Sequence, residues 1–170
     1  MPNDEVLIRP GRPDDIPELM AIFNHYIENT NARFTTQLLS LESCRAWFEG
    51  YGAGRYRLLV AHDGARLLGA AYSSRYRPSA AFDTTVETSI YLHPDRRRGG
   101  TGTRLYSALI SLLQDEDVHL AVAGVAQPNE ASNALHRKLG FEEVGTFRDY
   151  ARKRGLWISS TWFQRLVNAG

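Results

Sequence analysis

Three consecutive segments in the middle of the chain constrain its fold more than any other feature. Thr84–Leu92 reads as a strand that His93-Pro94 stops. Thr101–Gln114 carries leucines on one helical face, and Val118–Val125 is a nearly continuous apolar run, typical of a strand in the buried centre of a sheet. A strand, a helix and a strand in this order form a right-handed crossover, so the two strands should lie parallel.

The remaining segments place this crossover in a mixed sheet. Asp63-Gly64 is a turn signal between two strands, and consecutive strands with short connections favour an antiparallel meander. The expected fold class is α/β (α+β), with a mixed central sheet of about seven strands and helices on both faces. Strands are expected at residues 6–9, 57–62 and 66–76, a closing hairpin at 141–147 and 156–166, and helices from caps at Asp14 and Ser40 and over residues 130–139. In the helix that Ser40 caps, Leu41, Cys44, Trp47 and Phe48 should point inward.

Length and composition predict a single domain over residues 1–170 and exclude several classes of protein. The net charge of +1 gives no global reason to expect nucleic-acid or membrane binding. A single cysteine, Cys44, excludes an intrachain disulfide and suits a reducing compartment. Because the acidic N-terminus lacks a signal-peptide core and no apolar stretch is long enough to span a bilayer, we expect a cytoplasmic protein. His62, His93 and His119 lack the ligand spacing of a zinc site, so no metal is expected.

A loop rich in glycine and arginine, Arg96–Thr103, lies between the expected strand and the long helix. Its glycines let backbone N–H groups approach a ligand, the helix start offers unpaired donors and a positive dipole end, and the arginines offer forked donors for phosphate oxygens. The loop therefore suits a pyrophosphate, and a solvated basic turn is the alternative. It is not a P-loop, because Thr103-Arg104 follows Gly102, nor a dinucleotide fingerprint, because Leu105 stands where that motif needs glycine.

The motifs of the chain resemble those of a known family. Arg97–Gly102 resembles the pyrophosphate motif of the GNAT acetyltransferases, although Arg98-Gly99 inverts the commoner Gly-Arg order. Asn129–Ser132 and His136–Phe141 resemble the second GNAT motif. More narrowly, Asn24–Ile27, Thr85–Tyr91 and Leu135–Phe141 resemble the phosphinothricin and methionine sulfoximine N-acetyltransferases, and the likeness extends from about Ile8 to Leu166.

The resemblance implies a GNAT fold in which strands four and five, 84–92 and 118–125, splay apart and admit the pantetheine arm of acetyl-CoA. A backbone N–H of the fourth strand would then polarise the thioester carbonyl. The implied acetyl-CoA contacts are Ile90, Tyr91 and Leu92 along the strand, Arg97, Arg98, Gly99, Gly100, Thr101, Gly102 and Thr103 around the pyrophosphate, and Asn129 at the pantetheine arm. No acyl-enzyme nucleophile is needed, because the thioester is already activated.

Glu87 and His136 are the implied catalytic residues. Glu87 is the expected general base, and since an ordinary glutamate is far more acidic than an alkylammonium ion, it must be partly buried or act through water. The alternative is a charged residue on an exposed strand face. His136 stands where many GNAT sequences carry a tyrosine thought to protonate the departing thiolate. It is a general acid, a group that orients the substrate, or a helix histidine bonded to a nearby carbonyl.

The implied substrate contacts are Arg77, Phe82, Val86 and Phe34. Arg77 matches an arginine that contacts the anionic end of the substrate, and a solvent-facing arginine is the alternative. Ser79 and Phe82 stand where phosphinothricin-type members often carry a basic residue and a tyrosine. Their loss favours a less charged or more apolar substrate side chain, such as that of methionine sulfoximine or methionine sulfone.

The implied function is transfer of an acetyl group from acetyl-CoA to the primary amine of a small amino-acid-like molecule. The alternatives are another amine, namely an arsinothricin-like amino acid, a polyamine or a peptide N-terminus, and a CoA-binding module without catalysis. Relatives are usually homodimers, and the tail with Trp157, Trp162 and Phe163 would close the pocket, form a dimer face or pack in the core. The sequence leaves open whether detoxification is the biological role.

Overall fold

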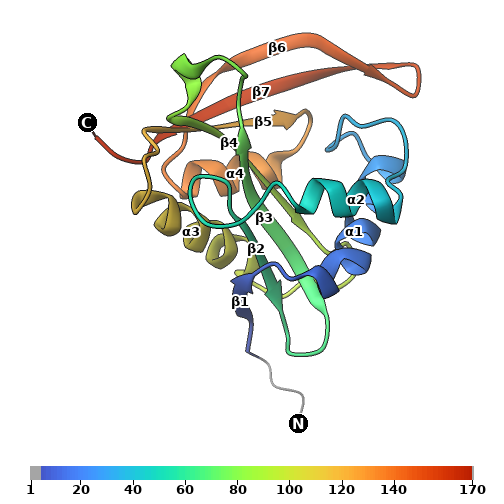
Figure 1. Cartoon of the computed structure of the whole chain (residues 1–170). Helices are drawn as coiled ribbons and strands as arrows, with labels where there is room; N and C mark the ends of the chain where they lie inside the picture. Colours follow the sequence, from blue (N-terminus) through green and yellow to red (C-terminus); the bar gives the residue numbers. More distant parts are fainter. Residues whose placement is uncertain (1–4, 170) are drawn as a thin grey trace.

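The computed structural model describes residues 5–169, which form a seven-stranded sheet (Figure 1). The strands are β1 (Leu7–Pro10), β2 (Leu58–His62), β3 (Leu67–Arg75), β4 (Thr85–Leu92), β5 (Leu120–Ala126), β6 (Glu142–Lys153) and β7 (Leu156–Leu166). Their order across the sheet is β1-β2-β3-β4-β5-β7-β6. β4 and β5 are parallel, and the other neighbouring strands pair antiparallel. The expected mixed sheet, with its parallel crossover, is confirmed.

Helices cover both faces of this sheet (Figure 1). The α-helices are α1 (Ile16–Asn29), α2 (Leu41–Phe48), α3 (Thr101–Gln114) and α4 (Glu130–Lys138), with short 3₁₀ helices η1 (Pro13–Asp15) and η2 (Ala80–Phe82). Side chains of α1 and α2 pack in one core, and those of α3 and α4 pack in the other. Within residues 5–169, no helix has the length and apolar character needed to cross a bilayer.

Alternate residues of the central strands point into the two cores. In β2, Leu58 and Val60 pack with α1, whereas Leu59 and Ala61 pack with α3. Because both faces are covered, these strands are almost continuously apolar, as the sequence of a sheet centre should be. Fully burying a large apolar side chain contributes about 1.5–3 kcal/mol relative to leaving it exposed, so both layers stabilise the sheet.

The beginnings of α1 and α2 differ from the sequence-based expectation. Asp14 does not cap α1, because η1 precedes the helix and the buried Asp15 carboxylate accepts hydrogen bonds from the Arg9 guanidinium, at 2.7 and 2.8 Å, and from the Arg12 N–H. Ser40 caps α2 as expected, by accepting from the Ser43 N–H. Cys44 is buried, but Leu41 is exposed, because it occupies the first turn beyond the edge of the core.

The closing hairpin is longer than expected. Its first strand was expected to end at residue 147, yet β6 continues to Lys153. Register shifts at Glu143/Gly145 and Phe147/Ala151 interrupt its pairing with β7, and the polar residues between them hid the extension from a hydrophobic pattern. Lys153 is buried and donates to the carbonyls of Thr30 and Arg33, at 3.0 and 2.7 Å. The hairpin therefore holds the loop that follows α1.

Gly69 sets the distance between β3 and the end of β4. It pairs with Leu92, and a Cβ atom at Gly69 would lie 2.8 Å from the backbone oxygen of Tyr91 and 2.8 Å from the Leu92 side chain. A backbone atom cannot turn aside as a side chain does, so glycine is required for this close approach.

Replacing Gly69 with alanine should lower the free energy of unfolding by about 1–3 kcal/mol, because the added methyl overpacks the sheet. Urea denaturation measures the change. Gly52→Ala is the matched control, since no atom lies within 4 Å of the Cβ position there. Equal stability of the two variants would contradict the role given to Gly69.

Candidate functional site

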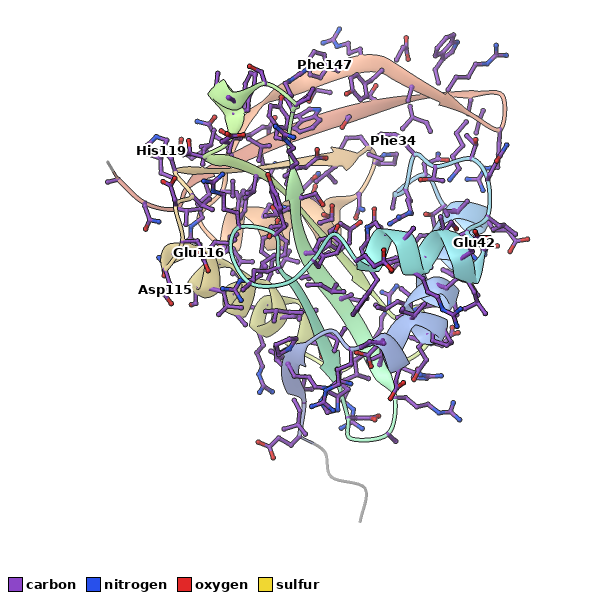
Figure 2. All side chains as sticks on the ribbon, in the orientation of Figure 1. Phe34, Glu42, Asp115, Glu116, His119 and Phe147 are labelled. Carbon is purple, nitrogen blue, oxygen red and sulfur yellow. The ribbon has the colours of Figure 1, made fainter. Side chains whose placement is uncertain are left out.

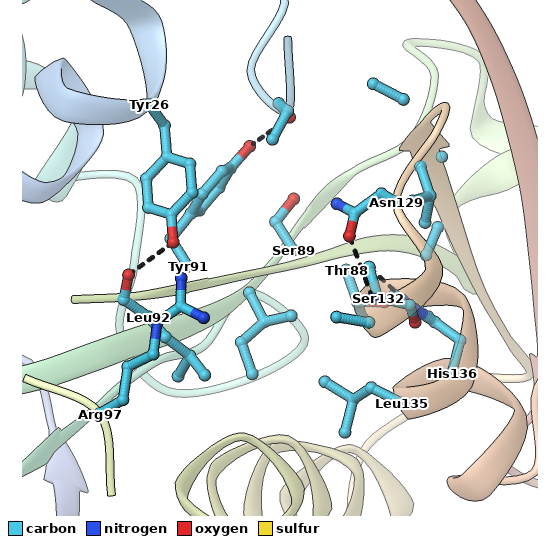
Figure 3. A pocket seen from close by; sticks show the side chains of 17 residues that line it. Tyr26, Thr88, Ser89, Tyr91, Leu92, Arg97, Asn129, Ser132, Leu135 and His136 are labelled. Carbon is cyan, nitrogen blue, oxygen red and sulfur yellow. Dashed lines mark hydrogen bonds between the residues drawn. The ribbon is translucent and has the colours of Figure 1, made fainter. Parts of the chain in front are cut away.

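The parallel pairing between β4 and β5 stops partway along the two strands. It joins Thr85 to Leu120, Val86 to Ala121 and Glu87 to Val122, whereas β4 stays paired with β3 as far as Leu92. Beyond Glu87, the edge of β4 that faces β5 therefore has no strand partner. A cavity of about 260 Å³ lies in this gap, between residues 88–92 of β4 and 123–126 of β5 (Figure 3).

A buried chain of polar side chains lies behind the point where the strands part. The Thr88 hydroxyl is 2.5 Å from the Tyr106 hydroxyl of α3 and 3.4 Å from the carbonyl of Val122, the last residue of β5 to pair with β4. Tyr106 is in turn 3.3 Å from Nε2 of His136 on α4. These contacts link α3 and α4 to β4 where the split begins.

The contacts of His136 assign its tautomer. Nδ1 lies 2.7 Å from the Ser132 carbonyl, which only accepts, so Nδ1 carries the hydrogen and Nε2 accepts from Tyr106. Burial lowers the pKa of His136, which favours the neutral ring. A neutral ring with both nitrogens engaged has no N–H left for a leaving group. His136 also lines the cavity.

A second hollow, of about 400 Å³, lies at the N-terminus of α3. The expected pyrophosphate loop lines it from Arg97 to Thr103, together with Leu135 and Lys138 of α4. Gly100 has a φ of +77°, a conformation that suits glycine, and the buried Thr101 hydroxyl has no hydrogen-bond partner among the described residues. Free N–H groups at the start of a long helix and an unsatisfied hydroxyl fit a phosphate-bearing ligand.

The three consecutive arginines of this loop have different partners. Arg96 forms an ion pair with Glu18 of α1 at 3.0 Å, and Arg98 forms one with Asp63 of the β2–β3 turn at 3.5 Å. Arg97 donates to the Pro94 carbonyl and lines both cavities. Of the three, Arg97 is therefore the side chain best placed to meet a phosphate in the gap.

Glu87 lies on the opposite face of β4 from Thr88, on the side covered by α1 and α2. It pairs with Ser74, whose hydroxyl lies 3.0 Å from that of Tyr51. Glu87 is half-buried, and burial raises the pKa of its carboxyl. It does not line the β4–β5 cavity itself, but Ser89, on the same face two residues further, does.

The expected substrate contacts are divided among three places. The side chain of Val86 is fully buried in the α3 core and faces away from Glu87. Arg77 lies over the rings of Tyr76 and Phe82, at 4.9 and 5.9 Å from their centroids. Tyr76 contacts Trp162 of β7, so this group borders the gap from the β7 side. Phe34 lies on the loop after α1, with its ring 6.0 Å from that of Tyr150 (Figure 2).

Four other residues that were expected to contact acetyl-CoA line the gap. Ile90, Tyr91 and Leu92 line the cavity on β4. Asn129 lines it at the N-terminus of α4, which its side chain also caps by accepting from the Ser132 N–H at 3.2 Å. Of the aromatic tail residues, Trp157 is exposed, Phe163 is in the core, and Trp162 lies against Gly124, whose Cβ position is 2.9 Å from the indole ring.

Tyr26 and Lys138 are among the cavity residues that were not assigned to the site from the sequence. Tyr26 of α1 lines the cavity and donates to the Leu92 carbonyl at 2.6 Å (Figure 3). Lys138 lines the hollow at α3. The spacing of Ala131, Leu135 and Lys138, which puts them on one face of α4, was a usable signal for Lys138. Within residues 5–169, no cluster of three or more His, Cys, Asp or Glu side chains is arranged to hold a metal ion.

Comparisons with known proteins agree with this arrangement. Residues 8–162 match the family described as the acetyltransferase (GNAT) domain. A phosphinothricin N-acetyltransferase of Streptomyces coelicolor is 42% identical, over 95% of this chain and 96% of its own length. An L-methionine sulfoximine/L-methionine sulfone acetyltransferase of Pseudomonas aeruginosa is 37% identical, over 92% of each chain.

A solved structure extends the likeness to three dimensions. The crystal structure of a GNAT superfamily phosphinothricin acetyltransferase from Sinorhizobium meliloti, in complex with acetyl-CoA, superposes with a TM-score of 0.91 at 28% identity. It covers 97% of this chain and 90% of its own. The protein therefore belongs to the GNAT acetyltransferases, within the group of phosphinothricin and methionine sulfoximine N-acetyltransferases.

Proposed function

We propose that this protein transfers an acetyl group from acetyl-CoA to the primary amine of a small amino acid, by direct attack in a ternary complex. One observation carries the proposal: the gap between β4 and β5 runs from the hollow at α3 toward the face of the sheet that carries Glu87. Acetyl-CoA would thus enter the gap from the α3 side of the sheet, and the amine substrate would reach the thioester from the side that carries Glu87. The names of the relatives from S. coelicolor and P. aeruginosa support the same chemistry.

The residues of the gap suit acetyl-CoA, which supplies an activated thioester when bound. Arg97, the N–H groups that begin α3 and the unpartnered Thr101 hydroxyl would hold the pyrophosphate. The open edge of β4 at Ile90, Tyr91 and Leu92 would pair with the amides of pantetheine, and Asn129 would contact the arm from α4. A backbone N–H of β4 would stabilise the negative charge that develops on the carbonyl oxygen.

Glu87 acts as the base in this proposal. The ammonium group of the substrate loses a proton to the carboxylate, directly or through water, and the amine nitrogen then attacks the carbonyl carbon. The C–N bond forms, the C–S bond breaks, and the second proton of the amine leaves with the thiolate. Burial of Glu87 makes it a stronger base than an exposed glutamate. Thr88, Tyr106 and His136 would hold β4 in position where its pairing with β5 ends.

The substrate side chain in this proposal is that of methionine sulfoximine, methionine sulfone or a similar amino acid. Arg77, Phe82 and Trp162 form the border that would meet this side chain. Ser79 and Phe82 add no charge to the border, which favours a neutral polar side chain over a phosphinate. A thiol-release assay over an amine panel that contains methionine sulfoximine, methionine sulfone, phosphinothricin and a polyamine tests this choice. Turnover of the polyamine alone would reject it.

We also propose that the protein is a homodimer that associates through the β6–β7 hairpin. Val144, Phe147 and Trp157 of this hairpin are 61%, 58% and 62% exposed. Figure 2 shows Phe147 on the outer side of β6, away from the helices. β6 is also an edge strand of the sheet. Exposed apolar side chains on a sheet edge are typical of an interface and favour a second copy of this chain as the partner.

Replacing Glu87 with glutamine should lower kcat by about 10²- to 10⁴-fold, the usual contribution of a general base. The base must be ionised, so the wild-type rate should fall as the pH drops through the raised pKa of Glu87. That acidic limb should lie above the range of an ordinary glutamate and should vanish in the variant. Initial rates measured across pH test both points.

Glu42→Gln is the control for the loss of one carboxylate, because Glu42 is exposed on α2 (Figure 2). Its kcat should match that of the wild type. An unchanged kcat in the Glu87 variant at neutral pH would remove Glu87 from the mechanism.

Replacing Gly100 with valine should raise the KM for acetyl-CoA at least about 10-fold, with a much smaller change in the KM for the amine, because the side chain intrudes where phosphate contacts are made. Gly64→Val is the control, since Gly64 also has a positive φ, +94°, but lies in the β2–β3 turn outside both cavities. Backbone strain alone would affect the two variants alike, so equal KM values for acetyl-CoA would contradict the assignment.

Replacing Phe147 with aspartate should shift the protein from dimer to monomer in sedimentation velocity, because it places a charge within the proposed apolar interface. Leu38→Asp is the control, as Leu38 is 58% exposed but lies on the loop before α2. A wild-type protein that sediments as a monomer would reject the proposed interface.

A further inference from the structure

We propose that Arg33, on the loop after α1, binds the α-carboxylate of the substrate and makes this enzyme select free α-amino acids over amines without that group. The inference rests on the proposed acetyl transfer and names its recognition element. The role of Arg33 depends on how this loop is folded back over the sheet.

Arg33 lies beside the gap and on the same side of the sheet as Glu87. The preceding residue, Ala32, lines the cavity. The guanidinium carbon is 4.4 Å from the centroid of the Phe23 ring and 5.3 Å from that of Tyr91. Tyr91 is four residues beyond Glu87 on β4, so both side chains leave the strand on the same face. Arg33 therefore packs above the part of β4 that leads from the gap to the proposed base.

The charge of Arg33 has no protein counterpart. Arg9, Arg57 and Arg96 are partly buried, and each forms an ion pair with a carboxylate. No Asp or Glu of the described chain lies within 4 Å of the Arg33 guanidinium in this way. Its charged group meets the rings of Phe23 and Tyr91 and the hydroxyls of Tyr72, at 3.1 Å, and of Tyr91. Burying an unpaired cation is costly, so a site of this kind is best explained by an anion that arrives from outside.

The guanidinium also has hydrogen-bonding capacity to spare. Nη1 donates to Tyr72, whereas Nε is buried with no partner among the described residues. The guanidinium also interacts with the Tyr91 hydroxyl, so Nε is the donor that is left without a partner. A carboxylate that approaches this side of the fork would receive charge-assisted hydrogen bonds.

Other unsatisfied polar atoms lie on the same face of the sheet. Four buried side-chain atoms of the described residues lack a partner: Arg33 Nε, Thr101 Oγ1, Ser160 Oγ and Trp162 Nε1. Thr101 belongs to the hollow at α3. Ser160 and Trp162 pair with Ala126 and Gly124 of β5, on the opposite face from Phe163 and the α3 core. Thr101 therefore lies at the proposed phosphate site, whereas Arg33, Ser160 and Trp162 lie on the same side of the sheet as Glu87.

The loop is held in place before any ligand arrives. Lys153 donates to the Thr30 and Arg33 carbonyls, and the Thr30 hydroxyl donates to the Tyr26 carbonyl at 2.8 Å. A fixed guanidinium loses little conformational freedom on binding. An α-amino acid carries its ammonium and carboxylate groups on one carbon. Glu87 would contact the ammonium group and Arg33 would contact the carboxylate. An amide, an ester or a polyamine offers no anion to Arg33.

Steady-state kinetics with methionine sulfone and its carboxamide test this inference. The wild type should prefer the acid. Arg33→Met should raise the KM for the acid by roughly 10- to 100-fold, the range for loss of a hydrogen bond to a charged group, and leave the KM for the amide nearly unchanged. Arg33→Lys keeps the charge without the fork and should give an intermediate acid/amide ratio. If the Arg33→Met variant does not fold, the acid/amide ratio of Arg33→Lys still tests the inference.

Two further variants test whether a change in the acid/amide preference is specific to Arg33. Arg45→Met removes an exposed arginine of α2 and should leave both substrates unaffected. Arg77→Met should keep the preference for the acid. Collapse of that preference in the Arg77 variant but not in the Arg33 variants would overturn the inference. An equal loss with acid and amide in the Arg33 variants would do so as well, because it would show that Arg33 only supports the aromatic cluster.

Titration of the wild type and the Arg33 variants with acetyl-CoA distinguishes failure of the Arg33 inference from failure of the proposed function. A wild type that binds acetyl-CoA but acetylates no amine would reject acetyl transfer, and with it the role of Arg33. A wild type that acetylates the acid and the amide equally well would reject the role of Arg33 alone.

Discussion

The site depends on one interruption in the sheet: the backbone pairing of β4 with β5 ends after Glu87 and Val122. An unpaired strand edge inside a sheet normally carries a penalty, because its N–H and C=O groups lose their partners. Here the Thr88 hydroxyl lies within reach of the Val122 carbonyl, and Tyr106 and His136 support Thr88 from the helices behind. The rest of the open edge is available to a ligand that can itself pair like a strand.

Successive side chains along β4 point to opposite faces of the sheet, so the two faces carry different parts of the candidate site. Val86 and Thr88 point toward α3, where they build the core and the polar support. Glu87, Ser89 and Tyr91 point toward α1, where the loop held by Lys153 brings Arg33 over the aromatic rings. A shift of one residue in this strand would exchange the two sets, so the register with β3 is as important to the chemistry as any side chain.

Much of the site could be predicted because it is local in the chain. The proposed phosphate loop is a run of glycines and arginines directly before a helix, so its position needed no tertiary information. The partners of Arg96 and Arg98 could not be predicted, since Glu18 and Asp63 are distant in sequence. The places of the aromatic tail residues also depend on contacts with distant segments, so composition could not predict them. Trp157 is exposed, Phe163 lies in the core and Trp162 lies against Gly124 of β5. The hydrophobic pattern also predicted too early an end for the first strand of the hairpin. Backbone pairing with β7 extends β6 to Lys153, and a hydrophobic pattern does not record that pairing.

The sequence by itself determined the mixed sheet and the parallel crossover, because both follow from the order and periodicity of neighbouring residues. It also determined the family, because the motifs that resemble the GNAT acetyltransferases are short and local in the chain. Only the tertiary structure decided that Val86 is core, that His136 is buried with its Nδ1 beside the Ser132 carbonyl and that Arg33 has no carboxylate partner among the described residues. Burial, tautomer and charge pairing depend on which distant segments meet across the two faces of the sheet. A linear pattern carries no direct record of those contacts.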